Sequence, residues 1–202
     1  MNYPSNIQDL INEFSRFPGI GQKTAQRFVF YLLRKQSQDI DRIVDYLEKI
    51  KDFKICSKCN IFSETDTCLI CQDKKRDQTV ITVVAEPQDL MAIEKIGEYK
   101  GVYFILGGLI NTSQDITPDK IKVKQLLDRL KNEPVKEIIF ALNSTLEGES
   151  TTLYLVNLIR KDFNLNKKIK MTKVARGLPL GGEIEYADEI TLSEALKDRK
   201  II

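Results

Sequence analysis

Residues 56–71 read CSKCNIFSETDTCLIC and contain every cysteine of the chain, as two CxxC pairs that are separated by eight residues. The two thiolates of a CxxC pair project from one tight turn, so each pair supplies one edge of a tetrahedron. Four thiolates at about 2.3 Å complete the coordination shell of a zinc ion and leave no position for water or substrate. The spacing therefore predicts one structural Zn²⁺ per chain, with these ligands: Cys56, Cys59, Cys68 and Cys71.

Three other interpretations of the cysteines fit less well. Two disulfides would suit a secreted chain, but the N-terminus MNYPSNIQDL has no apolar signal core. A redox CxxC motif needs only one pair, and Fe–S clusters usually have a different spacing. We expect the few apolar side chains of the segment to be buried, and metal binding to supply most of its folding free energy, on the order of 10 kcal/mol. These side chains are Ile61, Phe62, Leu69 and Ile70.

Composition excludes several classes of protein. Of the 202 residues, 42% are hydrophobic and 30% charged, as in ordinary globular proteins. No apolar run approaches the length that spans a bilayer, and four thiols that are best kept reduced favour a cytoplasmic location. The chain has no histidine, which excludes Ser/His/Asp triads, Cys–His nucleophiles and His-ligated catalytic metals. The net charge of +2 is too small to indicate nucleic-acid binding, so only the distribution of charge can do so.

Residues 7–35 have the pattern of a helix-hairpin-helix DNA-binding motif. Residues 7–15 have the apolar spacing of a short helix, Pro18 and Gly19 end it, Gly19-Ile20-Gly21 forms a tight turn, and a second helix begins near Thr24. Glycines let the backbone approach DNA closely, and the free N–H groups at a helix N-terminus receive phosphate.

The basic residues of the second helix lie on one side. Between residues 16 and 35 there are five basic residues and no acidic one. Lys23, Arg27 and Arg34 fall within about 40° of one another on a helix of 3.6 residues per turn. The opposite side is predicted to pack inward through Ala25, Phe28, Val29 and Leu32. Such cations contact the DNA backbone without reading its sequence; the alternative is a solvated basic helix after an ordinary glycine turn.

The rest of the chain alternates helices and apolar strands. Residues 39–53 form one more amphipathic helix, with no functional residue, before the cysteines. Strands are predicted at 79–86, 101–108, 135–143 and 168–175, with helices between them at 89–99, 120–132 and 151–163. This order predicts an α/β fold with a mostly parallel sheet that has helices on both faces. Functional groups gather at the C-terminal ends of such strands, which here are Glu86, Gly107-Gly108 and residues 143–148.

A glutamate after the first strand and an acidic element after a later one resemble the Toprim domain of topoisomerases and primases. In catalytic Toprim domains, the two aspartates of DxDxEG bind Mg²⁺ and the first-strand glutamate is implicated as acid and base. Here residues 143–148 read NSTLEG, so neutral residues replace both aspartates, while Glu86 and Glu147 remain, with Glu149 beside them. Mg²⁺ prefers carboxylate oxygens, so the resemblance implies a Toprim fold without its catalytic metal site.

The last segment, ARGLPLGGEIEYADE at residues 175–189, has a turn-rich loop around Arg176 followed by acidic residues up to Asp188. Acidic residues beside glycines suggest nucleotide and Mg²⁺, in the manner of a Walker B segment. The chain has no phosphate-binding G-x-x-x-x-G-K-[ST] loop, which weakens that interpretation. The alternative is a loop that packs the C-terminal segment or makes a subunit contact.

The four motifs in this order resemble the RecR family of bacterial recombination mediators over nearly the whole chain. The resemblance implies four parts: a helix-hairpin-helix at 1–54, a four-cysteine zinc finger at 55–73, a Toprim domain at 78–175 and a C-terminal assembly segment at 176–202. It also implies a ring-shaped tetramer on DNA, with RecO and RecF as partners in loading RecA at single-stranded gaps, and a nucleoid-associated location.

Carried over by motif, the resemblance implies that the hairpin glycines and Lys23, Arg27 and Arg34 contact DNA, and that Glu86 and Glu147 lie in the region of partner contact. It implies no catalytic residue. Two other functions remain open. One is a Mg²⁺-dependent nuclease or primase-like enzyme that uses Glu86 and Glu147, against which Asn143 and Thr145 argue. The other is a protein-only zinc scaffold whose hairpin mediates subunit packing.

Overall fold

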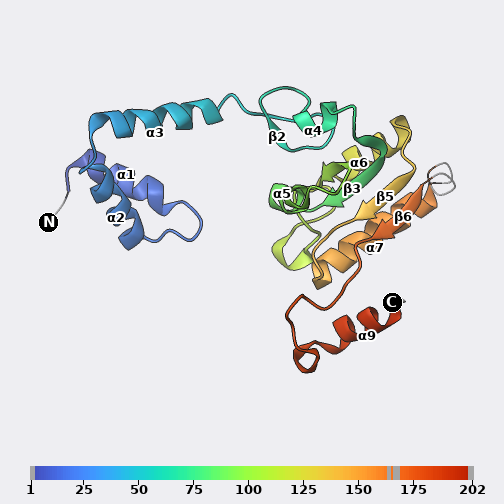
Figure 1. The fold of residues 1–202 in the computed structure, drawn as a ribbon. Helices are drawn as coiled ribbons and strands as arrows, with labels where there is room; N and C mark the ends of the chain where they lie inside the picture. Colours follow the sequence, from blue (N-terminus) through green and yellow to red (C-terminus); the bar gives the residue numbers. More distant parts are fainter. Residues whose placement is uncertain (1–2, 163–164, 166–168, 200–202) are drawn as a thin grey trace. The chain divides into compact units, whose positions relative to one another are not determined.

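A computed structural model describes residues 3–162, 165 and 169–199, and it divides into two compact units, Met1–Phe53 and Lys54–Ile202. Each unit has its own hydrophobic core. Among the described residues, no helix is both long enough and apolar enough to cross a membrane. The predicted α/β class is confirmed, since helices form the first unit and a parallel sheet with flanking helices forms the second (Figure 1).

The first unit consists of α1 (Ser5–Ser15), α2 (Gln22–Leu32) and α3 (Ser37–Ile50). The first two helices pack against each other around the buried side chains of Ile11, Ala25 and Val29, with three half-buried neighbours that complete the core: Ile7, Phe14 and Ile20. The prediction that Phe28 packs inward is wrong, because 44% of this residue is exposed. Its ring meets Phe14 of α1 edge to face at the margin of this core, with ring centroids 6.3 Å apart.

The apolar side of α3 is exposed. The helix is amphipathic, as its sequence predicts, but none of its described residues is buried. The residues of this side that are at least two-fifths exposed are Ile43, Val44, Leu47 and Ile50. An amphipathic helix gains its stability from packing its apolar face, and within Met1–Phe53 this face of α3 has no such partner among the described residues.

The cysteine segment forms a small module at the start of the second unit. A short antiparallel pair, β1 (Lys54–Ile55) and β2 (Phe62–Ser63), is followed by one helical turn, α4 (Leu69–Gln72). Ile61 and Ile70 pack against the cysteines as predicted. The expectation that Phe62 and Leu69 are buried is wrong, since 65% and 86% of them are exposed. The module is too small to enclose four large side chains.

The main sheet has four strands among the described residues, in the order β4-β3-β5-β6, and every neighbouring pair is parallel. The strands are β3 (Asp77–Val84), β4 (Gly101–Ile105), β5 (Glu137–Phe140) and β6 (Lys170–Lys173). They alternate with α5 (Pro87–Ile96), α6 (Val123–Asn132) and α7 (Leu146–Lys161). The predicted last residue of the 151–163 helix and the predicted first residue of the 168–175 strand lie outside the described residues.

Each strand contributes alternate side chains to the two faces of the sheet. On one face, Ile81, Val83 and Phe104 pack with residues of α6 and α7. On the other face, Val84 and Tyr103 pack with Leu90 of α5 and with Ile61 and Ile70 of the cysteine module. The helices divide between the two faces because each crossover between parallel strands is right-handed. The chain crosses the sheet one way from β3 to β4, which places α5 on one face. It crosses the other way from β4 to β5 and from β5 to β6, which places α6 and α7 on the opposite face.

The C-terminal segment contains a helix that the sequence patterns did not predict. After a short 3₁₀ turn at Ile184–Tyr186, α9 (Glu189–Lys197) begins with Asp188 as its N-cap, and the Asp188 carboxylate accepts a hydrogen bond of 2.9 Å from the Thr191 N–H. The signal that would have found α9 is this Asp cap with Glu189 directly after it, because both favour a helix N-terminus.

Candidate metal centre and candidate nucleic-acid interface

The sulfur atoms of the four cysteines lie within 4.8 Å of one another, and all four residues are buried. The Cys59 and Cys68 Sγ atoms are 3.5 Å apart. A tetrahedral ZnS₄ site with bonds of about 2.3 Å places its sulfur atoms about 3.8 Å apart, so the cluster fits one such ion. The structure thus brings together all four cysteines that the sequence singled out.

Local backbone geometry holds the two pairs. In the first pair, the Asn60 N–H bonds to the Cys56 carbonyl at 3.0 Å, and Asn60 has φ 66°, a left-handed conformation that asparagine tolerates. In the second pair, Cys68 is the N-cap of α4. The Cys68 N–H also points back to Cys56 Sγ at 3.3 Å, and so links the pairs. Backbone donors of this kind stabilise thiolates.

The close contacts among the four thiols change their pKa values. The hydrogen bond with Cys71 lowers the pKa of Cys59 to about 5, and the same hydrogen bond, with burial, raises the pKa of Cys71. Burial raises the pKa of Cys68 to about 11. Several thiolates in a buried cluster repel one another unless a cation neutralises them. A soft, all-sulfur donor set of this geometry suits a zinc-type ion.

The cysteine module covers the outer edge of strand β4. The Ile105 N–H donates to the Cys59 carbonyl at 2.9 Å, and the Asn60 side chain donates to the Ile105 carbonyl at 3.2 Å. These bonds satisfy backbone groups that an edge strand leaves unpaired. The module therefore continues the hydrogen bonding of the sheet and blocks its free edge.

Arg129, on α6, joins the module to the sheet. Its Nη1 donates to the Lys58 carbonyl at 2.9 Å and to the Tyr103 carbonyl at 2.8 Å, while its Nε pairs with Glu133 at 2.8 Å. Only 5% of the side chain is exposed. The sequence did not single out Arg129, because arginine in an amphipathic helix is normally solvated. Its one signal is that it shares a side of α6 with Leu126 and Leu130.

The hairpin of the first unit has the predicted glycine turn. Gly19 has φ 78°, the left-handed region that favours glycine, and the Ile20 N–H closes the turn on the Phe17 carbonyl at 3.0 Å. Gly21 is the N-cap of α2 and has no side chain to accept the N–H groups of the first helical turn. These groups are therefore open to an anion at the point where the turn meets the helix.

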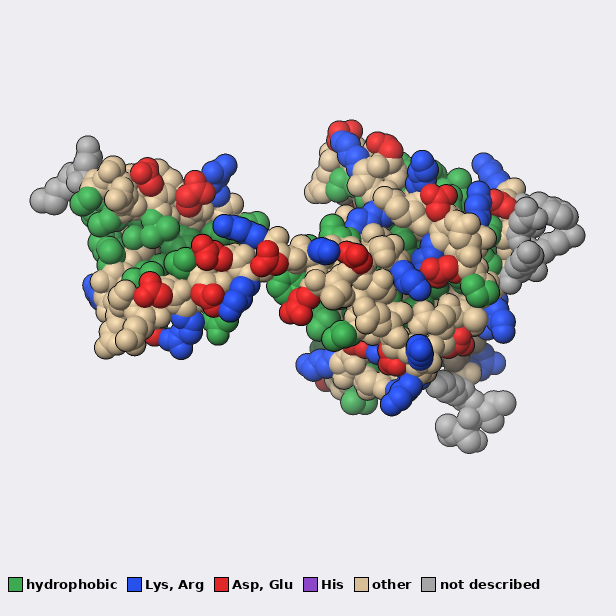
Figure 2. Space-filling view, turned by 90° about the horizontal axis from the view of Figure 1, so that it is seen from above, with side chains coloured by type: hydrophobic (Ala, Val, Ile, Leu, Met, Phe, Trp, Pro, Cys, Tyr) green, Lys and Arg blue, Asp and Glu red, His purple; other side chains and the backbone are tan. Residues whose placement is uncertain are grey.

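Lys23 and Arg27 lie beside that turn on the outer side of α2, and Arg34 lies just after the helix. Lys23 and Arg27 lie on the side of α2 opposite the buried Ala25 and Val29, and all three basic residues are exposed. Figure 2 shows that Lys and Arg side chains and hydrophobic side chains both reach the surface of Met1–Phe53. The arrangement suits a chain of phosphates that passes across α2.

The two Toprim-type glutamates lie at one end of the sheet. Val83 of β3 pairs with Phe140 of β5, so Glu86 and the 143–148 segment leave adjacent parallel strands at the same edge. Glu86 is exposed, and its backbone N–H donates to the Asp89 carboxylate at 2.9 Å, which caps α5. Glu147 is half-buried in the first turn of α7. Among the described residues, Glu86 and Glu147 share only their position at this edge of the sheet.

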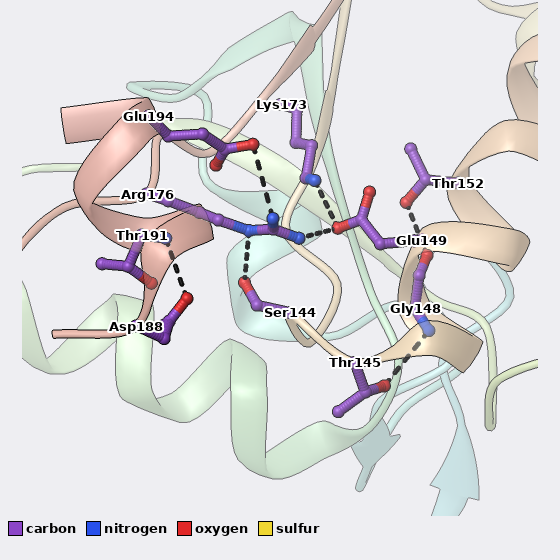
Figure 3. A network of polar contacts seen from close by, with 10 residues as sticks. All are labelled: Ser144, Thr145, Gly148, Glu149, Thr152, Lys173, Arg176, Asp188, Thr191 and Glu194. Atoms are coloured by element: carbon purple, nitrogen blue, oxygen red, sulfur yellow. Dashed lines mark hydrogen bonds and ion pairs between the residues drawn. The ribbon is translucent and has the colours of Figure 1, made fainter. Parts of the chain in front are cut away.

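Thr145, one of the two neutral residues that replace the aspartates, and its neighbour Ser144 make local contacts. The Thr145 hydroxyl accepts the Gly148 N–H at 3.3 Å and caps α7. Arg176, of whose side chain only 16% is exposed, extends from the C-terminal segment to the Ser144 hydroxyl at 3.2 Å and to the Glu149 carboxylate. Lys173 also binds Glu149, at 2.5 Å (Figure 3).

Glu194 of α9 completes this network through Arg176, at 3.4 Å. The hydrogen bond from Lys173 lowers the pKa of Glu149, and the guanidinium of Arg176 lowers it further. The sequence patterns indicated Arg176 and Glu149 without pairing them, and they gave no signal for Lys173 or Glu194. The network fastens α9 to the sheet edge and surrounds Glu149 with cations of the protein itself.

Gly148 permits a close approach of α7 to the 143–145 turn. A Cβ atom at this position would lie 1.9 Å from the Asn143 carbonyl oxygen, a backbone atom that cannot move aside. We expect Gly148→Ala to lower the free energy of unfolding by about 3 kcal/mol, although alanine favours a helix over glycine. Thermal unfolding followed by circular dichroism measures the loss. Ser150→Ala, at an exposed position of the same helix, should leave the midpoint unchanged; equal midpoints for both variants would contradict the predicted collision.

Comparisons with known proteins agree over the whole chain. Residues 7–51 match the family model "RecR, helix-hairpin-helix", residues 79–175 match "Toprim domain" and residues 177–200 match "RecR, C-terminal". The chain is 46% identical over 200 residues to the "Recombination protein RecR" of Lactococcus lactis subsp. cremoris (strain MG1363), with 98% of each chain covered. The chain belongs to the RecR family. The resemblance seen in the sequence is thereby confirmed.

Other RecR proteins are about as similar. That of Staphylococcus haemolyticus is 45% identical over 200 residues, with 98% of each chain covered, and that of Bifidobacterium adolescentis is 43% identical over 201 residues, with 99% of this chain and 98% of the relative covered. The predicted combination of helix-hairpin-helix, four-cysteine cluster and Toprim domain is therefore that of a RecR recombination protein.

Proposed function

We propose that this RecR-family chain is a non-catalytic mediator of recombinational DNA repair, which binds the DNA backbone through its hairpin. The observation that carries the proposal is the surface of α2, where Lys23 and Arg27 lie next to the glycine turn and the open first turn of the helix. Gly19 and Gly21 allow DNA to approach, and Arg34 extends the basic side. These groups bind phosphate without reading bases.

The proposed cofactor is one structural Zn²⁺ per chain, held by Cys56, Cys59, Cys68 and Cys71. Four sulfur ligands leave no position for a substrate. The role of the ion is to hold the module against the β4 edge, where it supports the bonds of Cys59 and Asn60 to Ile105.

The absence of catalysis is supported by what surrounds the Toprim edge. Thr145 caps a helix, and Glu149 is neutralised by Lys173 and Arg176. A catalytic Mg²⁺ needs carboxylates that are free to coordinate it. Glu86 and Glu147 remain at this edge, and we assign them to the region that contacts partner proteins.

RecO and RecF are the proposed protein partners, and RecA loading at single-stranded gaps is the proposed outcome. A second copy of the chain is a further partner, in a homotetrameric ring. Contacts between copies need exposed apolar area, which the apolar side of α3 and the C-terminal segment supply. A ring brings several weak hairpins to one DNA molecule and raises avidity. The proposed location is cytoplasmic and nucleoid-associated, with functional parts at 1–54, 55–73, 78–175 and 176–202.

Charge reversal tests the hairpin. We expect Lys23→Glu/Arg27→Glu to weaken binding to gapped duplex DNA. The slope of the logarithm of the binding constant against the logarithm of the salt concentration should also become less steep, by about 0.9 for each phosphate contact removed. The measurement is a gel-shift titration over a salt series with Mg²⁺, after which the DNA is recovered and its length checked; it should remain intact.

The matched control is Lys49→Glu/Lys51→Glu, which makes the same change in net charge at exposed positions at the end of the first unit. It should retain most of the wild-type affinity and slope. If the hairpin variant assembles and binds like wild type, the hairpin role is wrong. Shortened DNA that depends on Glu86 would show an enzyme instead.

A further inference from the structure

An open groove of about 480 Å³ lies on the surface of α2, lined by Thr24, Arg27, Phe28 and Tyr31. These residues follow one another at intervals of three, one and three, so they form one stripe along the helix. Of the two aromatic residues, Phe28 is 44% exposed and Tyr31 is 59% exposed. Two partly exposed rings beside an arginine form a surface that suits a ligand with a flat apolar face and a negative charge.

The aromatic stripe runs directly beside the phosphate-binding cations. At 100° per residue, Lys23 and Arg27 occupy an arc of about 40° on α2, and Tyr31 and Phe28 occupy the next 100° or so. Arg27 is one of the two phosphate-binding cations and also lines the groove. A strand whose phosphates follow the cations would therefore have its bases within reach of the rings.

The two rings are held in place by their neighbours. Phe28 meets Phe14 of α1 edge to face, with ring centroids 6.3 Å apart. The Lys35 ammonium lies 4.7 Å from the centre of the Tyr31 ring. The contact with Phe14 limits the motion of the Phe28 ring, so this ring loses less conformational entropy when a base stacks on it. Lys35 also adds a cation on the side of the groove away from the hairpin.

We propose that this groove binds an unpaired base of single-stranded DNA by stacking on Tyr31 and Phe28, while Lys23 and Arg27 hold the adjoining phosphates. Stacking on aromatic side chains beside a basic track is the usual way in which proteins bind single strands without sequence preference. Paired bases are stacked inside a duplex and cannot enter such a groove. The inference rests on the proposed DNA-binding function and adds the class of DNA that the hairpin prefers.

The surrounding charge favours a nucleic acid over an apolar protein segment. From residue 16 to residue 35 the chain has five basic residues and no acidic one. A polyanion with flat bases satisfies both the cations and the rings. An apolar peptide would satisfy only the rings and would bury Arg27 without a partner, which is unfavourable.

The test uses the full-length protein and two single-stranded oligonucleotides of equal length, one with thymine bases and one with abasic sites throughout. Both have the same phosphates, so only stacking distinguishes them. We expect the abasic strand to bind at least about fivefold more weakly, the factor that corresponds to the lower range for one stacked base. Fluorescence anisotropy of an end label, at a fixed salt concentration, measures both affinities.

Tyr31→Leu removes the ring and keeps an apolar side chain, so it should weaken binding of the thymine strand severalfold and leave the abasic strand unchanged. Tyr31→Phe keeps the ring and should bind like wild type. The matched control is Tyr46→Leu on α3, since Tyr46 is 60% exposed and has the Lys49 ammonium 5.7 Å from its ring centre. This control should not alter either affinity.

Equal affinity of wild type for both strands, or an unchanged affinity of Tyr31→Leu, would overturn the stacking proposal while leaving phosphate binding by the hairpin intact. If Tyr31→Leu weakens both strands equally and alters the sedimentation of the protein, the groove is a contact between copies of the chain, and the proposal is wrong. If wild type binds neither strand nor gapped duplex, the proposed DNA-binding function itself fails.

Discussion

Cys71→Ser is expected to abolish metal binding and to unfold the cysteine module. A serine hydroxyl stays protonated at neutral pH and is a poor zinc ligand, so the variant keeps three of four sulfur ligands. The metal contributes on the order of 10 kcal/mol to structural zinc modules, more than the few apolar contacts of Ile61 and Ile70 can replace. Zinc content should fall from one ion per chain to a small fraction.

Loss of the module should also expose the β4 edge. The Ile105 N–H now donates to the Cys59 carbonyl, and this amide should exchange its hydrogen much faster in Cys71→Ser. Metal analysis and hydrogen exchange measure the two effects. Ser57→Ala, at an exposed position of the same loop, should keep the metal and the protection. A Cys71→Ser protein with one zinc per chain and a protected Ile105 amide would show that the four-cysteine assignment is wrong.

Arg129→Ala is expected to lower the free energy of unfolding of the second unit by about 3 kcal/mol. The variant leaves the Lys58 and Tyr103 carbonyls without their buried donor and Glu133 without its cation. The value is at the lower end for a buried pair, because 27% of the Glu133 side chain is exposed. Since Lys58 lies between two of the proposed zinc ligands, Cys56 and Cys59, we expect the variant also to release zinc to a chelator severalfold faster.

Chemical denaturation and the rate of zinc transfer to a coloured chelator measure the two effects of Arg129→Ala. Arg129→Lys should rescue little, because one ammonium cannot reproduce the geometry of a guanidinium that binds two carbonyls and a carboxylate. Lys124→Ala is the matched control, at an exposed position of the same helix. If Arg129→Ala unfolds and releases zinc like this control, the bridge between module and sheet has no energetic role.

Local patterns in the sequence determined a large part of this protein. The spacing of the four cysteines determined the four-sulfur cluster, because two CxxC turns can present their sulfur atoms to one ion. Alternating apolar strands and helices determined the parallel sheet, because such strands need both faces covered. The glycines at 19 and 21 determined the hairpin turn, since Gly19 occupies a conformation that other residues rarely adopt.

The tertiary structure alone decided which distant groups meet. Arg129 reaches a carbonyl 71 positions earlier in the chain, and Arg176 reaches Glu149 across 27 positions. Phe28 meets Phe14 of α1 with its ring, yet 44% of the residue stays exposed. Periodicity reports which side of an element is apolar, but it does not report which element lies against that side. Such pairings depend on the order and register of strands, and these are set by the packing of the whole sheet.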